Sequence, residues 1–204
     1  MKTHLALFWV VILALTSSAS FAVQKKCDTP FRGRYVNAEH GYSFTVPTGY
    51  GGQWQSPCAY DDKLRDCICI GNHGLYIALT NTSGISVFSG FPAELDEENP
   101  AEVKILASMV ATERQAAKEL GATSLRVESV QVRTNWARRV WTIWVDAASN
   151  QKMKKVSYQM VTRANNPAGE SAELTVSLVA PENEFDARMP LLSEVLESFK
   201  WLRD

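Results

Sequence analysis

The stretch from Thr123 to Ala180 carries four successive segments in which apolar and polar residues alternate. A period of two residues is typical of strands with one buried and one solvated face. Polar turn sequences, Ala147–Lys152 and Asn165–Gly169, separate the later segments. Connections this short can join only antiparallel neighbours, because a parallel return needs about a dozen residues or more. The stretch therefore predicts an antiparallel β-meander on which the rest of the chain packs.

The first two segments of the meander depart from simple alternation. Leu125 and Val127 alternate with polar neighbours, and after a break of register Val130 and Val132 do the same. Val140–Val145 is apolar at every position but one, so both of its faces are apolar. A strand of this kind is expected to be covered above and below.

A long helix is expected before the meander. Asn99 can cap it, Pro100 suits its first position, and Gly121 can end it in the left-handed conformation. Its expected apolar face contains Val103, Leu106, Val110, Ala117 and Leu120, broadened by Ile105, Met109 and Ala116. Glu113 interrupts this face, and the sequence gives no reason for it.

A second helix is expected to close the chain. Its apolar face comprises Phe185, Met189, Leu192, Leu196 and Phe199. Pro190 lies inside this run. It is tolerated if the regular helix begins near Ala187, since the backbone N–H groups of the first turn have no partner within the helix; otherwise it kinks the helix. Phe199 and Trp201 are expected to anchor this end of the domain.

Further strands are expected before the long helix. Tyr35–Val36 and Gly41–Pro47 read as a strand pair, and residues 66–70, 75–80 and 84–88 as three more strands. The loop Pro47–Trp54 carries three glycines between aromatic residues and is expected to be an exposed turn.

The N-terminus has the features of a cleaved signal peptide. A basic start, an apolar run from Leu5 to Leu15 and small residues before Ala22 predict cleavage after Ala22. The apolar run is too short to span a bilayer, which needs about 20 residues. Loss of Lys2 leaves 20 basic and 22 acidic residues, a net charge of −2. This balance argues against nucleic acid as a partner, and we expect a secreted or periplasmic protein without a membrane span.

All four cysteines, Cys27, Cys58, Cys67 and Cys69, lie in the exported part of the chain. In an oxidising compartment an even number predicts disulfides, here two, whose connectivity the sequence leaves open. Cys67 and Cys69 leave the same face of an expected strand, near the limit of separation for a bridge, so each is expected to pair elsewhere. The alternative is a metal site formed by Cys67, Cys69 and His73.

Two stretches, one near each end of the chain, have a recognisable pattern. They are Tyr35-x-Asn37-x-x-x-Gly41-Tyr42-Ser43-Phe44-Thr45-Val46-Pro47-x-Gly49 and Ala180-Pro181-x-x-x-Phe185, followed by Leu192-x-x-Val195-Leu196-x-Ser198-Phe199. Both resemble the PsbP-like superfamily, which includes PsbP and the DcrB-like envelope proteins. The resemblance implies an α+β fold, an antiparallel sheet flanked by the long central helix and the C-terminal helix in an α/β/α sandwich. We therefore expect a signal peptide at 1–22, an N-terminal extension at 23–33 and one PsbP-like domain at 34–204. The segment between Cys58 and Cys69 departs from that family's pattern.

No catalytic motif of a hydrolase or metalloprotease occurs in the sequence, and the resemblance carries over no catalytic residue or cofactor. The leading hypothesis is a non-enzymatic exported module that binds a partner protein or envelope component. Tyr50, Trp54 and Trp136 are the candidate binding residues, since aromatic residues are enriched at interfaces. Of the tryptophans, Trp54 and Trp136 each lie near a turn and are therefore expected to be exposed. The rival hypothesis is a hydrolase that uses His40 or His73 with an acidic neighbour.

Overall fold

The computed structural model describes residues 30–55, 58–61, 66–69, 73–90, 102–163 and 171–202. For 58–61 and 66–69 it describes the backbone alone. The expected signal peptide and Cys27 therefore lie outside the described residues. So do the helix cap at Asn99 and Pro100 and the turn at Asn165–Gly169.

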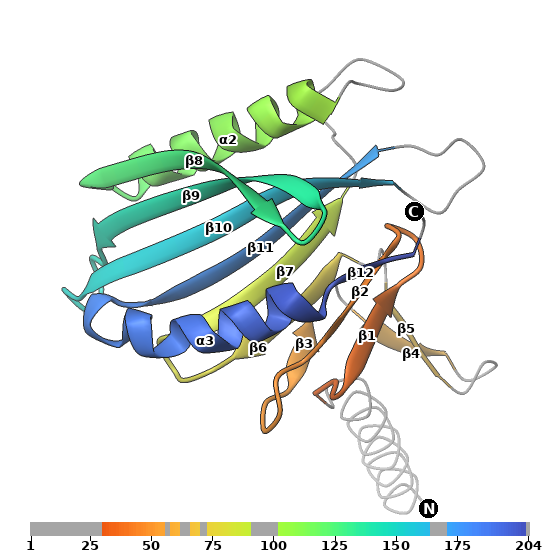
Figure 1. Ribbon diagram of the computed structural model, residues 1–204. Helices are drawn as coiled ribbons and strands as arrows, with labels where there is room; N and C mark the ends of the chain where they lie inside the picture. Colours follow the sequence, from red (N-terminus) through yellow and green to blue (C-terminus); the bar gives the residue numbers. More distant parts are fainter. Residues whose placement is uncertain are drawn as a thin grey trace, which may run out of the picture.

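A seven-stranded antiparallel sheet forms the centre of the molecule (Figure 1). Its strands lie in the order β3-β6-β7-β11-β10-β9-β8. Their bounds are β3 Gly52–Trp54, β6 Gly74–Ala78, β7 Gly84–Gly90, β8 Ser124–Val132, β9 Asn135–Val145, β10 Lys152–Arg163 and β11 Ser171–Pro181. The predicted meander is confirmed as four consecutive neighbours, β8 to β11.

The expected break of register in β8 does not interrupt its pairing with β9; the apolar side chains of the strand change from one face of the sheet to the other. β8 pairs with β9 without interruption from Ser124 opposite Ile143 to Val132 opposite Asn135. Along an uninterrupted strand successive side chains alternate between faces, so Leu125 and Val127 lie on one side and Val130 and Val132 on the other. The two halves of this strand thus contribute apolar residues to opposite layers.

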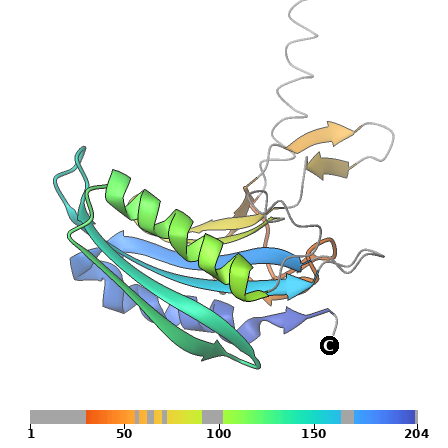
Figure 2. The ribbon, with the colours of Figure 1, turned by 90° about the horizontal axis from the view of Figure 1, so that it is seen from above.

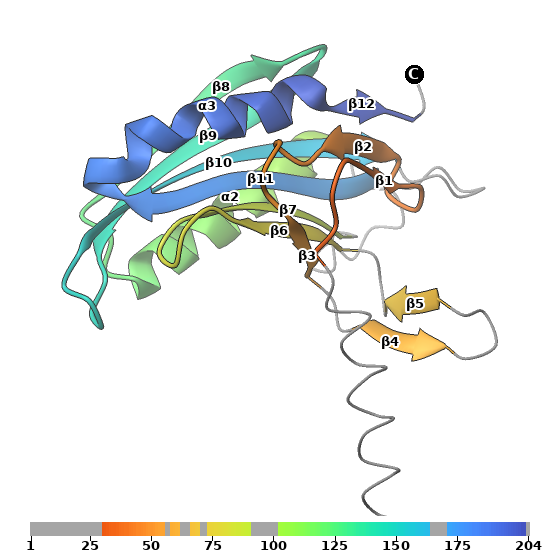
Figure 3. The ribbon, with the colours of Figure 1, turned by 90° about the horizontal axis from the view of Figure 1, so that it is seen from below.

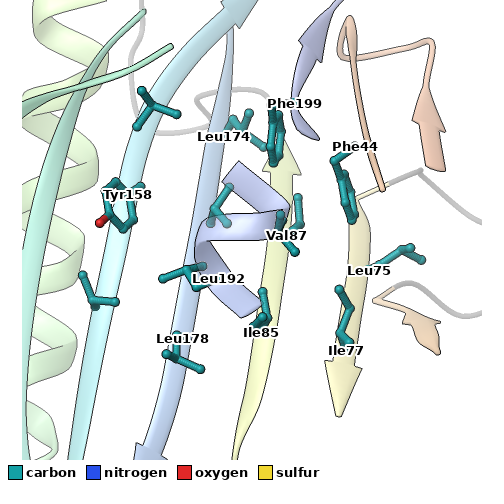
Figure 4. Close-up of a cluster of buried hydrophobic side chains, with 14 of the residues drawn as sticks. Phe44, Leu75, Ile77, Ile85, Val87, Tyr158, Leu174, Leu178, Leu192 and Phe199 are labelled. Atoms are coloured by element: carbon teal, nitrogen blue, oxygen red, sulfur yellow. The ribbon is translucent and has the colours of Figure 1, made fainter. Parts of the chain in front are cut away.

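Two helices cover opposite faces of the sheet (Figure 2), as predicted. Helix α3 (Glu182–Ser198) packs against β11 and β10, and it buries Phe185, Leu192 and Val195. Opposite it lie the inward residues of the central strands, among them Leu75, Ile85, Val87 and Leu178 (Figure 4). This face of the sheet carries the main hydrophobic core.

Helix α2 (Glu102–Glu119) lies on the other face, over β9, β10 and β11. Its buried residues are Ile105, Leu106, Met109 and Ala117, whereas Val103 and Leu120, expected on the buried face, are 67% and 50% exposed at the helix ends. The position of Glu113 on this face is explained by an ion pair: its carboxylate lies 2.9 Å from the ammonium of Lys155 on β10. As predicted, Gly121 ends the helix with a φ of 65°.

A second, three-stranded sheet closes one end of the molecule (Figure 3). β2 (Tyr42–Thr45) pairs with β1 (Arg34–Asn37), as expected, and with the unexpected β12 (Lys200–Trp201). Phe199 is fully buried and its ring lies 5.4 Å from Phe44 and 5.7 Å from Tyr42. The expected anchoring role of Phe199 therefore arises from ring packing between α3 and the small sheet.

Helix α3 begins earlier than the sequence indicated. It starts at Glu182 and not near Ala187, so Pro190 lies in its interior. Pro190 and Asp186, whose carbonyl loses a donor there, are both exposed to solvent. Water can satisfy that carbonyl, which explains why the proline is tolerated.

Among the described residues, neither helix is long and apolar enough to cross a bilayer.

Candidate functional site

The hairpin formed by β8 and β9 ends in a two-residue turn, Arg133–Thr134. Arg133 adopts a φ of 54°, in the left-handed region that a tight hairpin turn requires and that residues other than glycine, asparagine and aspartate seldom adopt. Its guanidinium donates to the carbonyl of Glu197, in the last turn of α3. A positive charge is favourable at the C-terminal end of a helix. Arg133 thus links the hairpin turn to α3.

Between this hairpin and α3 lies a cleft of about 230 Å³, which we call the hairpin cleft. Its apolar wall is formed by Val130, Val132 and Leu196, and its polar wall includes Arg139 and Tyr158. The cleft exists because β8 changes its apolar face: Val130 and Val132 point toward α3 and not toward α2. Tyr158, on β10, lies at the margin of the main core (Figure 4).

Arg139 is held by several groups at once. It donates to Oε2 of Glu128 from Nε at 2.8 Å and from Nη2 at 2.5 Å, and it lies 5.6 Å from the ring centre of Trp141. A hydrogen bond to the Tyr158 hydroxyl and the bond to Glu128 raise the pKa of Arg139. In return, the hydrogen bond from Arg139 lowers the pKa of Glu128. A guanidinium fixed in this way is preorganised, so a ligand meets it without ordering it first.

Trp136 lies just beyond the turn and is 63% exposed, as the sequence predicted. It is next in sequence to Ala137, which pairs with Val130 on the cleft side, so Trp136 points to the other side of the hairpin. The segment Val132–Trp136, which we call the hairpin tip, therefore offers a cleft on one side and an exposed indole on the other.

The other two candidate binding residues lie elsewhere. Tyr50 is half-buried against the main core. Trp54 was expected to be exposed, but it is half-buried too, because its ring packs 5.6 Å from Tyr35 and 6.1 Å from Phe31. Both belong to the β3 side of the molecule, at the opposite edge of the sheet from the hairpin. The expected exposed turn is in part the strand β3, which packs its aromatic residue into the small sheet.

His40 takes part in a buried hydrogen-bond network. Its Nδ1 lies 2.7 Å from Oγ of Ser89, and that hydroxyl is 3.0 Å from the hydroxyl of Tyr42. Asn37 contributes its amide to the same cluster. His40 is 1% exposed and Ser89 is 0% exposed. A serine–histidine pair at this distance could be nucleophilic at a surface, but here a substrate has no access to the hydroxyl. The network joins β2 and the β1–β2 turn to β7.

His73 does not lie with a described cluster of metal ligands. Its Nδ1 is 3.0 Å from the carbonyl oxygen of Ser89, and its ring stacks on Phe88 at 5.5 Å. Within the described ranges, no group of three His, Cys, Asp or Glu residues is placed to hold a metal. The side chains of Cys67 and Cys69 lie outside the described residues, so the metal alternative stays a prediction.

The cysteine backbone adds one fact. β4 (Cys58–Asp61) and β5 (Asp66–Cys69) pair antiparallel, and the register sets Cys58 opposite Cys69.

The sequence did not identify the cleft residues. One signal was available: Arg138 and Arg139 are adjacent and directly precede the apolar run Val140–Val145. One of two adjacent charged residues in a strand must point to the covered face, where it needs a partner. The sequence could not show that Tyr158, two strands away along the sheet from β8, reaches the same space as the last turn of α3.

No protein-family model and no curated protein matches this chain. Several solved structures are similar to it, and three of them are described here. LpqN of Mycobacterium tuberculosis, involved in cell envelope biogenesis, is 12% identical with a TM-score of 0.46, over 78% of this chain and 82% of LpqN. The cyanobacterial PsbP (CyanoP) of Synechocystis sp. PCC 6803 is 15% identical with a TM-score of 0.37, over 82% and 91%. The Ran-binding protein Mog1p of Saccharomyces cerevisiae is 11% identical with a TM-score of 0.46, over 85% and 97%.

The TM-scores of all three lie below 0.5, so these likenesses carry no argument about the fold or the function of this chain. The α+β class itself, an antiparallel sheet with a helix on each face, follows from the structure of this chain.

Proposed function

We propose that this protein is an exported, non-enzymatic module that binds a partner protein or envelope component at the hairpin tip and the hairpin cleft. The observation that supports the proposal is the cleft itself, where an apolar wall faces the fixed guanidinium of Arg139. Arginine and tryptophan are the residues most enriched in binding hot spots, and both occur here next to one turn.

The size of the cleft favours a macromolecular partner. A volume of about 230 Å³ lies below the roughly 300–1,000 Å³ of pockets that enclose a small ligand. It is enough for one or two side chains of a docked protein. An apolar side chain of the partner would contact Val130, Val132 and Leu196 in the cleft. A second part of the partner, reaching around the hairpin tip, would contact the exposed Trp136 on the other side of the hairpin.

The charge of the hairpin favours a partner with acidic groups. β8, β9 and their turn carry four arginines (Arg126, Arg133, Arg138 and Arg139) and one glutamate, Glu128. Exposed charges of one sign steer a partner of the opposite sign to the site. The solved structures named above add no support at their TM-scores, so the proposal depends on the hairpin alone.

The test is site-specific photo-crosslinking in the native host. A photoreactive residue at Ser193, in the wall of the cleft, should capture a partner that mass analysis identifies. The same residue at Arg114, on the exposed side of α2, is the control and should capture none of it. Equal capture at both positions, or capture at Arg114 alone, would show that the site lies elsewhere.

A further inference from the structure

β8 is an open edge of the seven-stranded sheet. It is the last strand in the order and pairs only with β9 among the strands that the structure describes. Figure 3 shows it as the outermost strand on its side of the molecule. Its nine residues present a row of backbone donors and acceptors along that edge. Such an edge is a template for pairing with another strand.

The charges along this edge are self-complementary. Arg126 and Glu128 are two residues apart, so both side chains lie on the same face, and within one chain they already form an ion pair. Arg126 is 73% exposed, and Glu128 is 18% exposed. When two antiparallel copies of β8 pair about Val127, Arg126 of each copy stands opposite Glu128 of the other. We propose that two copies of this chain associate in this way, with Val127 on the two-fold axis.

The neighbouring registers are excluded by charge. Pairing centred on Arg126 sets two arginines opposite each other, and pairing centred on Glu128 sets two glutamates opposite each other. Directly opposed like charges destabilise a strand pair, whereas opposite charges contribute about 0.2–1 kcal/mol each. A two-fold axis repeats each contact, so the register at Val127 gains two favourable pairs and the alternatives gain a repulsive one.

The apolar residues fit the same register. Val127 meets Val127 of the second copy, and Leu125 lies on the same face next to it. Both are half-buried in one chain and would be covered further in the pair. Residues 124–130 of each copy face one another, which leaves the hairpin tip outside the contact but includes Val130 of the cleft wall. The two proposals can be tested separately, because Arg126 and Val127, where the pairing is tested, do not line the cleft.

The first test is self-association of the purified chain, measured by sedimentation equilibrium over a range of concentrations. The mass should rise toward that of a dimer. Arg126→Glu should weaken the association about tenfold or more, because both symmetric pairs become repulsive. Arg114→Glu makes the same charge change on the exposed side of α2 and should leave the association unchanged. A mixture of Arg126→Glu with Glu128→Arg should associate again, since each then faces its opposite charge.

The second test does not depend on the Glu128 variant, which also loses its bond to Arg139. Only the residue on the two-fold axis lies opposite itself, so Val127→Cys should form a disulfide between copies, found as a 127–127 linked peptide. Ser129→Cys, on the same strand but off the axis, should not. A monomer at every concentration overturns the proposal. So does a dimer that Arg126→Glu leaves intact, or one that links through Ser129→Cys and not Val127→Cys.

Discussion

Arg139 and Glu128 connect the candidate site to the sheet. The pair spans β8 and β9, and Arg139 reaches Tyr158 on β10, so three strands hold one guanidinium. The hydrogen bond from Arg139 is the main cause of the lowered pKa of Glu128. This coupling has a consequence for stability as a function of pH.

A carboxyl group whose pKa is lowered by folding stabilises the folded state at every pH above its unfolded pKa. That contribution is lost as the pH falls through the folded pKa. Part of the acid sensitivity of this protein should therefore come from Glu128. In an acid titration followed by circular dichroism, Glu128→Gln should be less stable than wild type at neutral pH, with a difference that shrinks as the pH falls. A difference that grows toward acid pH would contradict this reading.

Two buried threonine hydroxyls on opposite faces of the sheet, Thr142 on the α2 side and Thr162 on the side of the main core, differ in their bonding. The hydroxyl of Thr142 is buried and makes no hydrogen bond within the described structure, whereas that of Thr162 donates to the carbonyl of His40 at 3.0 Å. Thr142→Val should therefore leave the free energy of unfolding unchanged or raise it by up to about 1 kcal/mol. Thr162→Val, the matched control, should lower it by about 1–3 kcal/mol. Denaturant unfolding measures both, and a clear loss in Thr142→Val would show that its hydroxyl has a partner.

At the scale of elements, Phe199 joins α3 to the small sheet. Its ring is fully buried against Tyr42 and Phe44. Phe199→Ala should lower the free energy of unfolding by about 3–5 kcal/mol, the usual cost of such a cavity. Val103→Ala, at a 67% exposed position of α2, should change it by less than about 0.5 kcal/mol. An unchanged denaturation midpoint in Phe199→Ala would mean that α3 is not docked on the small sheet.

The pairing of β4 with β5 makes a prediction about the cysteines. Opposite residues of an antiparallel pair have Cα atoms about 4.5–5.5 Å apart, a separation that a disulfide can bridge. Cys58 and Cys69 are opposite residues, so we expect them to be linked, which leaves Cys27 for Cys67. Mass analysis of peptides made without reduction checks this. A Cys58–Cys67 link would contradict it, and four free thiols would favour the metal alternative.

The elements that the sequence predicted are those long enough to show a period. Alternation over many residues identified β8 to β11, and Gly121 marked the end of α2. Strands of two or three residues, β3 and β12, carry no period and were missed. The turn at Arg133 has no glycine or asparagine to mark it. The start of α3 was placed too late because Pro190 was expected in the first turn of the helix, whereas solvent exposure allows it in the interior. The sequence identified Trp136 as a candidate binding residue. It could not identify Arg139 and Tyr158, because the pairing of β9 with β10 brings them together.

At the scale of the molecule, the two ends of the sheet have different roles. The end near β3 is closed by the small sheet and its packed aromatic rings, Tyr35, Tyr42, Phe44 and Phe199. The other end is the open strand β8 and the hairpin tip, where the side chains of Arg126 and Trp136 are exposed. The closed end, near β3, stabilises the fold. The open end, at β8, makes the proposed contacts with other molecules.

The affinity of the partner for two variants distinguishes a binding site at the hairpin tip from one on α2. Trp136→Ala and Val103→Ala each remove an exposed apolar side chain, 63% and 67% exposed, one at the tip and one on α2. With the partner captured through Ser193, Trp136→Ala should raise the Kd about tenfold or more, as expected for a hot-spot residue, and Val103→Ala should leave it unchanged. The opposite result would contradict the account: a raised Kd for Val103→Ala together with a wild-type Kd for Trp136→Ala.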